Sequence, residues 1–339
     1  MPKLCHSKLW KKLEKNKVRC ITCSHKCLIH PGRQGICGVR ENQNGKLYSL
    51  VYGKAIAVNI DPIEKKPFFH FLPGSKSLSV ATVGCSFRCD NCQNWPISQA
   101  PKIGTQTIEG EDWPPAKIVK MALDTNCSSI SYTYTEPAVF VEYALDTMRQ
   151  AKKYKLKNTW VSNGYMTAEC IGVIAPHLDA ANIDFKSFSD KFYRANCGGA
   201  LQPVLDSLKL LKAKKVWVEI TTLVIPGISD DMAMLEKMAD WILKEMGPET
   251  PWHISQFYPA YKLVNIPATP VETIVKICKM GQKKGLKYVY TGNLPGAYYE
   301  DTYCPKCRQM MIDRYEYSIM RFDKNGKCRN CGQDLSLVL

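Results

Sequence analysis

Three cysteines lie close together in the segment VGCSFRCDNCQNW, residues 83–95, which directly follows the apolar segment SLSVAT. Cys85, Cys89 and Cys92 have the spacing C-x3-C-x2-C. Disulfides are disfavoured in a reducing cytosol, so clustered cysteines there are more typical of metal ligands. A closed structural zinc site has four ligands, and an ordinary iron–sulfur cluster also takes four cysteines. Three thiolates therefore predict a ligand set with one open metal position.

A [4Fe–4S] cluster meets this description best. Bound by three cysteines, it has one iron without a protein ligand, and that iron can bind a small chelating molecule. The alternatives are a zinc site completed by a distant ligand and a chance grouping of cysteines. The position of the motif, directly after an expected strand, favours the cluster.

Two further sets of four cysteines flank this motif. The C-terminal set is close to zinc-ribbon spacing and predicts a structural zinc site, with an auxiliary cluster or a nucleic-acid contact as alternatives. It consists of Cys304, Cys307, Cys328 and Cys331. The N-terminal set is less regular, and nearby His25 and His30 enlarge the choice of ligands, so structural zinc is favoured there with a second iron–sulfur cluster as its rival. It consists of Cys20, Cys23, Cys27 and Cys37. The five other cysteines are expected to be buried small hydrophobes.

The charge balance gives weak information about partners. The chain has 339 residues, with 46 Lys and Arg against 31 Asp and Glu, and a formal net charge of +15. Thiolates in two zinc sites and one cluster lower this to about +10. That value allows an acidic protein partner or RNA, and we expect no nucleic acid as the main partner. No run of 18 apolar residues and no secretory h-region occur, so we expect a cytoplasmic protein without membrane contact.

Strand-like and helix-like segments alternate through the middle of the chain. The strand-like segments are residues 78–83, 128–134, 158–162, 178–185, 216–224, 252–257 and 287–292. Apolar residues at three- and four-residue spacing predict helices over 114–126, 138–154, 204–213 and 230–246. This alternation predicts an α/β fold with a parallel sheet, a partial (β/α)6-type TIM barrel. We expect a cysteine-rich N-terminal module over 1–75, the barrel over 76–300 and a zinc-ribbon-like module over 301–339.

Polar residues occur where the expected strands end, which is where barrels of this kind carry their chemistry. Besides the three cysteines, these residues are Thr135, Glu136, Asn163, Asp184 and Lys186, with Thr221, His253 and Gln256 on the later strands.

Several segments resemble the radical S-adenosylmethionine (SAM) enzymes. VGCSFRCDNCQNW, YTYTEPAVF, VSNGY, IDFKSFSD and WHISQFYPAYK are similar to the pyruvate formate-lyase activating-enzyme branch, and IDPIEKKPFFHFLPGS resembles the radical SAM enzymes of the AmmeMemoRadiSam system. The resemblance implies that the open iron binds the amino and carboxylate groups of SAM. An electron from the cluster then cleaves a C–S bond, which yields methionine and a 5′-deoxyadenosyl radical.

The resemblance also assigns cofactor-binding roles. Glu136 is expected to receive the SAM ammonium, although the glycines usual in that turn are absent here, and Asn163 to lie near the methionine moiety. Lys186 is expected to meet the SAM carboxylate while Asp184 fixes the amine, because residues i and i+2 of a strand share a face. His253 is expected near the ribose and adenine. The alternatives are a solvated loop acid, a simple turn, a structural ion pair and a core histidine.

Some features stay open or depart from the pattern. Asn91 replaces the aromatic residue usual before the third cysteine, and the segment TWVSNG lacks the acid of a monovalent-ion site. Lys65, Lys66 and His70 could face the substrate or belong to a packing loop.

The resulting hypothesis is a radical SAM oxidoreductase, similar to the glycyl-radical activating enzymes. Its cofactors would be a [4Fe–4S] cluster, SAM and zinc, and its electron donor reduced ferredoxin or flavodoxin. The substrate would be a partner protein, either a glycyl radical enzyme or a MEMO-type protein, or a small molecule. A ferredoxin-like carrier is disfavoured because no further cysteine follows Cys92 before Cys127. A zinc-ribbon protein that binds or modifies RNA remains an alternative.

Overall fold

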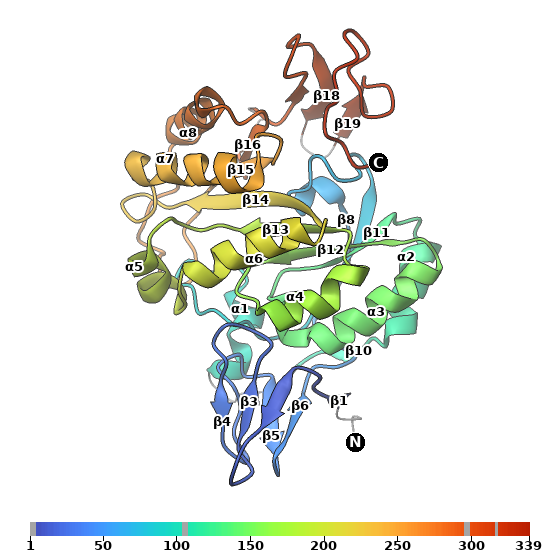
Figure 1. The fold of residues 1–339 in the computed structure, drawn as a ribbon, viewed down its shortest axis with the longest axis vertical. Coiled ribbons are helices and arrows are strands. Elements are labelled where there is room, and N and C mark those ends of the chain that lie inside the picture. Colours follow the sequence, from blue (N-terminus) through green and yellow to red (C-terminus); the bar gives the residue numbers. More distant parts are fainter. Residues whose placement is uncertain (1–4, 104–107, 295–298, 316–317) are drawn as a thin grey trace.

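The computed structural model describes residues 5–103, 108–294, 299–315 and 318–339, and a single large sheet lies at its centre (Figure 1). Seven parallel strands follow one another in chain order across this sheet, and one antiparallel strand, β8, lies beside β9 at one edge. The strands are β8 (Ala57–Pro62), β9 (Lys76–Ala81), β11 (Ser129–Tyr132), β12 (Lys157–Ser162), β13 (Ala180–Asp184), β14 (Trp217–Val224), β15 (Trp252–Gln256) and β16 (Val289–Gly292). Since β16 and β8 are the two edges, the sheet is an open, partial barrel. The predicted α/β fold with a parallel sheet is confirmed.

Helices occupy the connections between the parallel strands, as the periodicity predicts. The longer ones are α2 (Pro115–Asp124), α3 (Val141–Lys153), α4 (Ala168–Ile174), α6 (Gln202–Ala213), α7 (Met232–Trp241) and α8 (Val271–Lys284). Each buries an apolar stripe; in α8 the stripe includes Ile274, Ile277 and Cys278. This helix ends at Gly285, whose φ of 114° favours glycine.

Short helical turns complete the connections. They are α1 (Trp95–Ser98), α5 (Asp190–Phe192), the 3₁₀ turns η1 (Ile63–Lys65), η2 (Ala100–Lys102), η3 (Pro137–Phe140) and η4 (Ala175–His177), and the π turns η5 (Tyr193–Cys197) and η6 (Ile242–Met246). No helix in the described part of the chain is both long and apolar enough to cross a membrane.

The N-terminal region forms small antiparallel sheets at one end of the molecule (Figure 1). One contains β1 (Cys5–His6), β6 (Lys46–Ser49) and β5 (Arg40–Gln43), another contains β2 (Trp10–Lys12), β3 (Val18–Cys20) and β4 (Leu28–Ile29), and β7 (Lys54–Ala55) pairs with β10 (Glu111–Asp112). Arg40 joins this region to the barrel through a buried ion pair with Glu142 of α3, 2.6 Å between Nη2 and Oε2. The chain has no sharp boundary between the N-terminal region and the barrel, because β8 already belongs to the main sheet.

The C-terminal region, at the opposite end in Figure 1, is a three-stranded sheet of β17 (Thr302–Tyr303), β18 (Met310–Tyr315) and β19 (Ser318–Arg321). Buried Arg314 of β18 donates from Nη2 to the carbonyl of Phe69 at 2.7 Å. The C-terminal region therefore packs on the segment that leads into the first parallel strand.

Candidate active site at the mouth of the barrel

A cavity of about 310 Å³ lies where the parallel strands end. Its wall combines the loop after β9 with residues at the ends of β11 to β15. The predicted site residues among its lining are Cys85, Cys89, Cys92, Glu136, Asn163, Asp184 and Lys186. Segments more than 100 residues apart in the chain thus meet at one opening.

The loop that carries the three cysteines is fixed on both sides. Arg88 and Asp90 donate backbone hydrogen bonds to the carbonyls of Cys197 and Asn196, at 2.9 and 3.1 Å. Gly84 has a φ of 98°, and a Cβ there would lie 2.6 Å from Val39 Cγ1. The chain can therefore turn from β9 into the loop only where a residue without a side chain allows both the backbone angle and the contact.

Hydrogen-bond donors surround two of the three sulfurs. The backbone N–H of Phe87 lies 3.4 Å from Cys85 Sγ, and Asn163 Nδ2 lies 3.7 Å from the same sulfur. Ser98 Oγ lies 3.3 Å from Cys92 Sγ. Such donors stabilise a thiolate and tune the potential of a cluster bound to it.

The donor set fits a three-cysteine cluster and does not fit a closed zinc site. In the described residues, none of these thiols belongs to a group of three or more metal-binding side chains whose ligand atoms lie within 4.8 Å of one another. A tetrahedral zinc site needs such closeness. Three sulfurs that line a cavity leave room for a larger inorganic core with an open position.

Glu136 is the buried carboxylate of the site, at the N-terminus of η3. Its Oε1 accepts from Ala138 N at 3.1 Å and Ser162 Oγ at 2.9 Å, and its Oε2 accepts from Asn163 N at 2.9 Å. Burial raises the pKa of Glu136 to about 7, because these hydrogen bonds only partly compensate for lost hydration. The carboxylate is thus rigidly placed and can change its charge near neutral pH.

Asn163 connects this carboxylate to the cysteine loop. Its Nδ2 donates to Ser86 Oγ at 3.0 Å, and its Oδ1 accepts from the backbone N–H of Tyr165 at 2.9 Å. The turn after β12 is thereby held against the cysteine loop.

Asp184 and Lys186 form an ion pair at the end of β13, with 2.8 Å between Asp184 Oδ2 and Lys186 Nζ. Burial acts to lower the pKa of Lys186, but Asp184, together with the nearby Cys89 and Cys197, more than offsets burial and raises this pKa well above its usual range. Both residues line the cavity, so the pair is compatible with a structural role and with contact to an anionic group of a ligand.

His253 lies deeper in the barrel and is not among the residues that line the cavity. It is 1% exposed, and its Nε2 lies 2.8 Å from Glu219 Oε2. Glu219 also accepts from the backbone N–H groups of Phe69, His70 and Phe71. Glu219, bound to His253, therefore holds residues 69–71 against the barrel, and the structure does not place His253 at the cavity with the other predicted residues.

The three residues of the DPIEKKPFFHF segment left open above separate in the structure. Lys65 and Lys66 line the cavity, and buried Lys66 pairs with Asp61 at 2.6 Å. His70 is fully buried, with its Nε2 2.7 Å from Tyr290 Oη. The segment thus serves the cavity with its lysines and the packing of the barrel with its histidine.

Two contacts of the site were not expected from the sequence. Cys197, taken above as an isolated buried cysteine, lies near Cys89. Tyr134 lines the cavity and donates to Asp61, while its ring lies under Lys66, 4.1 Å from Nζ to the ring centroid. Cys197 follows no recognisable spacing, whereas Tyr134 stands directly before Thr135 and Glu136 and shares their strand-end position.

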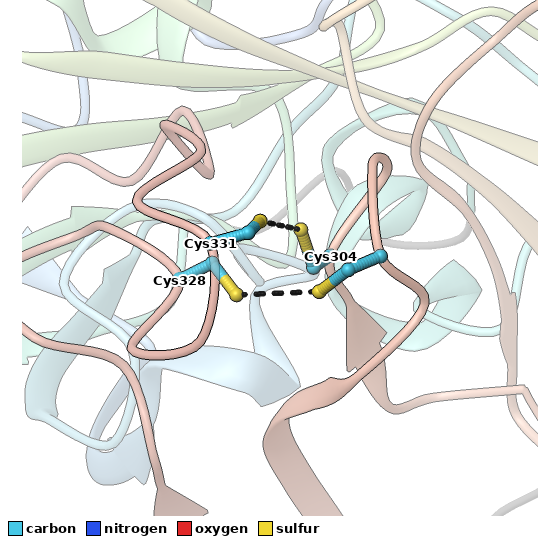
Figure 2. Close-up of side chains that lie close together, drawn as sticks. Cys304, Cys328 and Cys331 are labelled. Atoms are coloured by element: carbon cyan, nitrogen blue, oxygen red, sulfur yellow. Dashed lines mark hydrogen bonds between the residues drawn. The ribbon is translucent and has the colours of Figure 1, made fainter.

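The C-terminal cysteines form a compact four-sulfur group (Figure 2). Their sulfurs lie 3.6 Å apart in two contacts, Cys304 to Cys331 and Cys307 to Cys328. The backbones of Arg308 and Gly332 donate to the carbonyls of Cys304 and Cys328, which makes two matching turns. This donor set fits a tetrahedral metal such as zinc. The N-terminal cysteines, in contrast, line a small cavity of their own without forming a group of this compactness.

Comparisons with known proteins agree with this geometry. A family model described as the radical SAM superfamily matches residues 79–242. The uncharacterized protein MJ0808 of Methanocaldococcus jannaschii is 43% identical over 97% of this chain and 98% of its own length. A radical SAM methyltransferase from Sphaerobacter thermophilus has a TM-score of 0.52 at 13% identity, over 65% of this chain and 67% of that chain. SuiB of Streptococcus suis bound to S-adenosylmethionine has a TM-score of 0.50 at 12% identity, over 66% of this chain and 52% of that chain. At such identities the structures show a common fold. We conclude that the chain belongs to one family with MJ0808 and that its residues 79–242 form a radical SAM domain.

Proposed function

We propose that this protein is a radical SAM oxidoreductase whose cluster is bound by Cys85, Cys89 and Cys92. The observation that carries the proposal is the convergence of three cysteines with Glu136 and the Asp184–Lys186 pair on one cavity at the strand ends. When bound, a [4Fe–4S] cluster supplies the electron that cleaves SAM to methionine and a 5′-deoxyadenosyl radical.

The side chains of the cavity divide the recognition of SAM between them. Lys186 binds the carboxylate, while Asp184 and Glu136 accept from the N–H groups of the amino group. Asn163 holds the turn beside the methionine moiety. Charge-assisted hydrogen bonds of this kind are roughly twice as strong as neutral ones, so they orient the sulfonium toward the cysteine loop.

The size of the cavity bears on the substrate. Its volume of about 310 Å³ is at the lower end of the range for ligand pockets. A cluster and a SAM molecule together would fill it, so the substrate reaches the radical from the mouth. This favours a partner protein that presents a segment of chain, as in glycyl-radical activation or modification of a MEMO-type protein.

A small-molecule substrate is the second candidate, and Lys65 and Lys66 favour it. Both lysines pair with the single carboxylate of Asp61, so the three side chains carry one net positive charge at the cavity wall. This charge suits a substrate with a carboxylate or phosphate group. In either case the electron donor is a reduced ferredoxin or flavodoxin, and the C-terminal cysteines hold zinc. The sixteen free cysteines suit a reducing compartment, and we place the protein in the cytoplasm.

Anaerobic incubation with SAM and dithionite tests this function. We expect 5′-deoxyadenosine and methionine in equal amounts, from the wild type and from the matched control Cys278→Ala, whose buried cysteine lies in α8 away from the site. Adding each candidate partner in deuterated form then identifies the hydrogen donor, because only the true substrate transfers deuterium into 5′-deoxyadenosine. Absence of SAM cleavage in cluster-loaded protein would refute the proposal.

A further inference from the structure

The four N-terminal cysteines surround a small cavity of their own. Cys20 ends β3, Cys23 and Cys27 lie in the turn that follows, and Cys37 precedes β5. Three of the four side chains are 5 to 9% exposed, and Cys27 is partly exposed. Buried cysteines that share one cavity but form no disulfide are candidates for an inorganic ligand.

Their spacing differs from that of the C-terminal set. Zn–S bonds of about 2.3 Å in a tetrahedron hold the sulfurs about 3.8 Å apart, and the C-terminal contacts of 3.6 Å meet this requirement. In the described residues, the N-terminal cysteines contribute to no group of three or more metal-binding side chains whose ligand atoms all lie within 4.8 Å of one another. The same is true of Cys85, Cys89 and Cys92. In a cubane cluster each cysteine binds a different iron. The cysteine sulfurs therefore lie farther apart around a cluster than around a single zinc ion.

The wall of this cavity is suited to an anionic, sulfur-rich group. Backbone N–H groups of His25, Ile36 and Val39 lie near the sulfurs of Cys23, Cys27 and Cys37 respectively. Donors near the sulfurs favour thiolates and any cluster that the thiolates bind.

Arg40 adds a buried positive charge at the same cavity, with 1% of its surface exposed. Its Nη1 and Nη2 atoms bind Glu142 and Ser7, whereas its Nε has no hydrogen-bond partner among the described residues. A buried N–H without a partner is costly, and an acceptor sulfur in the cavity would satisfy it.

The N-terminal cysteines also contact the loop that carries the catalytic ones. His25, two residues after Cys23, lies with its Nε2 2.9 Å from the carbonyl of Ser86, the neighbour of Cys85. On the other side, Gly84 approaches Cys37 so closely that a Cβ there would lie 3.0 Å from the Cys37 carbonyl oxygen. The N-terminal cysteines and the loop of Cys85, Cys89 and Cys92 are therefore linked by two contacts.

We propose that Cys20, Cys23, Cys27 and Cys37 hold a second [4Fe–4S] cluster that passes single electrons to the cluster at the barrel mouth. With four thiolates it has no open iron, so electron transfer suits it better than substrate binding. A one-electron protein donor, such as a reduced ferredoxin, is oxidised by one electron as this cluster is reduced. The same electron then moves to the barrel-mouth cluster, and one is consumed for each SAM cleaved. This relay rests on the proposed function, whereas the presence of the second cluster does not.

Metal counting on the full chain tests the second cluster. For protein isolated anaerobically from cells supplied with iron and zinc, we expect about eight iron, eight sulfide and one zinc per chain. The variant Cys85→Ala/Cys89→Ala/Cys92→Ala should keep about four iron and an EPR signal that SAM does not change. Conversely, Cys23→Ala/Cys27→Ala should keep only the SAM-sensitive signal, and Cys127→Ala/Cys278→Ala should keep both.

About two zinc and four iron in the wild type, with no iron in the triple variant, would overturn the second cluster. If a variant fails to fold, the zinc-to-iron ratio of the wild type and the presence of one or two EPR signals decide the question. A protein with eight iron that does not cleave SAM would support the second cluster and refute the proposed function.

The choice of reductant tests the relay. With a reduced [2Fe–2S] ferredoxin, SAM cleavage by Cys23→Ala/Cys27→Ala should fall by roughly tenfold or more, while dithionite, a small molecule that reaches the barrel mouth directly, should restore it. Equal rates with ferredoxin in the variant and the wild type, or equal losses with both reductants, would overturn the relay.

Discussion

The barrel mouth and the C-terminal region both gather cysteines with a C-x2-C step, yet their surroundings differ. At the C-terminus two matching turns bring four sulfurs together, and the ligands themselves form the core with Met311 and Leu335. At the barrel mouth the loop is held by neighbouring segments, and the sulfurs border a cavity that also contains charged groups. From this difference we infer that the closed set serves folding, whereas the open set leaves a position for chemistry.

The largest expected effect comes from removing the open set. Cys85→Ala/Cys89→Ala/Cys92→Ala should reduce 5′-deoxyadenosine formation below detection, because no ligand remains for the cluster at the cavity. The C-terminal zinc content and the circular dichroism spectrum should stay those of the wild type. Product analysis by mass spectrometry checks this, and a triple variant that still cleaves SAM would remove the distinction between the two sites.

Removing the closed set should produce the reverse pattern. Cys304→Ser/Cys328→Ser should lose about one zinc per chain and unfold the C-terminal region, since structural zinc contributes its binding free energy to folding. Hydrogen exchange in residues 301–339 should rise sharply. SAM cleavage per folded molecule should change little, and its complete loss in protein with an intact cluster would contradict a purely structural role.

A smaller effect is expected from Lys186→Met, which keeps the length of the side chain and removes its charge. Loss of a charge-assisted hydrogen bond costs on the order of 1.5–3 kcal/mol, or roughly ten- to hundredfold in SAM affinity. Cluster absorbance should remain. The exposed Lys191 provides the control Lys191→Met. If the Asp184–Lys186 pair is only structural, the variant should instead lose stability and cluster content, with an unshifted SAM titration curve.

The smallest effect concerns pH. Because burial raises the pKa of Glu136 to about 7, its carboxylate gains charge as the pH rises through this value. SAM affinity should therefore increase roughly tenfold between pH 6 and pH 8, and Glu136→Gln should abolish that increase. Equilibrium dialysis against labelled SAM measures both. A pH dependence that persists in Glu136→Gln would assign it to another group.

Glu136 should affect stability with the opposite sign. Its pKa in the folded protein is above the ordinary value of 4.5, so its stabilising contribution is complete below about pH 4.5 and is lost as the pH rises toward 7. Glu136→Gln should consequently raise the melting temperature at pH 8 relative to the wild type. An equal difference at pH 4 and pH 8 would contradict this.

Hydrophobic periodicity was sufficient to predict the sheet. The expected strand over 216–224 corresponds to β14 (Trp217–Val224), and that over 252–257 to β15 (Trp252–Gln256). The position of the cavity could also be predicted, because parallel strands all present their carboxyl ends at the same edge of the sheet. The antiparallel strand β8 was not predicted, since its pairing with β9 depends on tertiary contact rather than on local pattern.

The placement of single side chains was harder to predict. Strand position alone does not say how deep a residue lies, so the sequence could not distinguish His253, bound to Glu219 inside the barrel, from Ser255 at the cavity two residues later. The contact of Cys197 with Cys89 joins segments 108 positions apart, and no spacing rule predicts it. Likewise, the double role of the DPIEKKPFFHF segment depends on the barrel around it.

The most direct test of the central claim is electron–nuclear double resonance on the reduced protein with isotopically labelled SAM. If three cysteines leave one iron open at the cavity, ¹⁵N in the amino group and ¹⁷O in the carboxylate of SAM should both show hyperfine coupling to the cluster. The Lys186→Met variant should show the same couplings at higher SAM concentration. Absence of coupling from either label in a cluster that SAM is known to saturate would contradict an open iron at Cys85, Cys89 and Cys92.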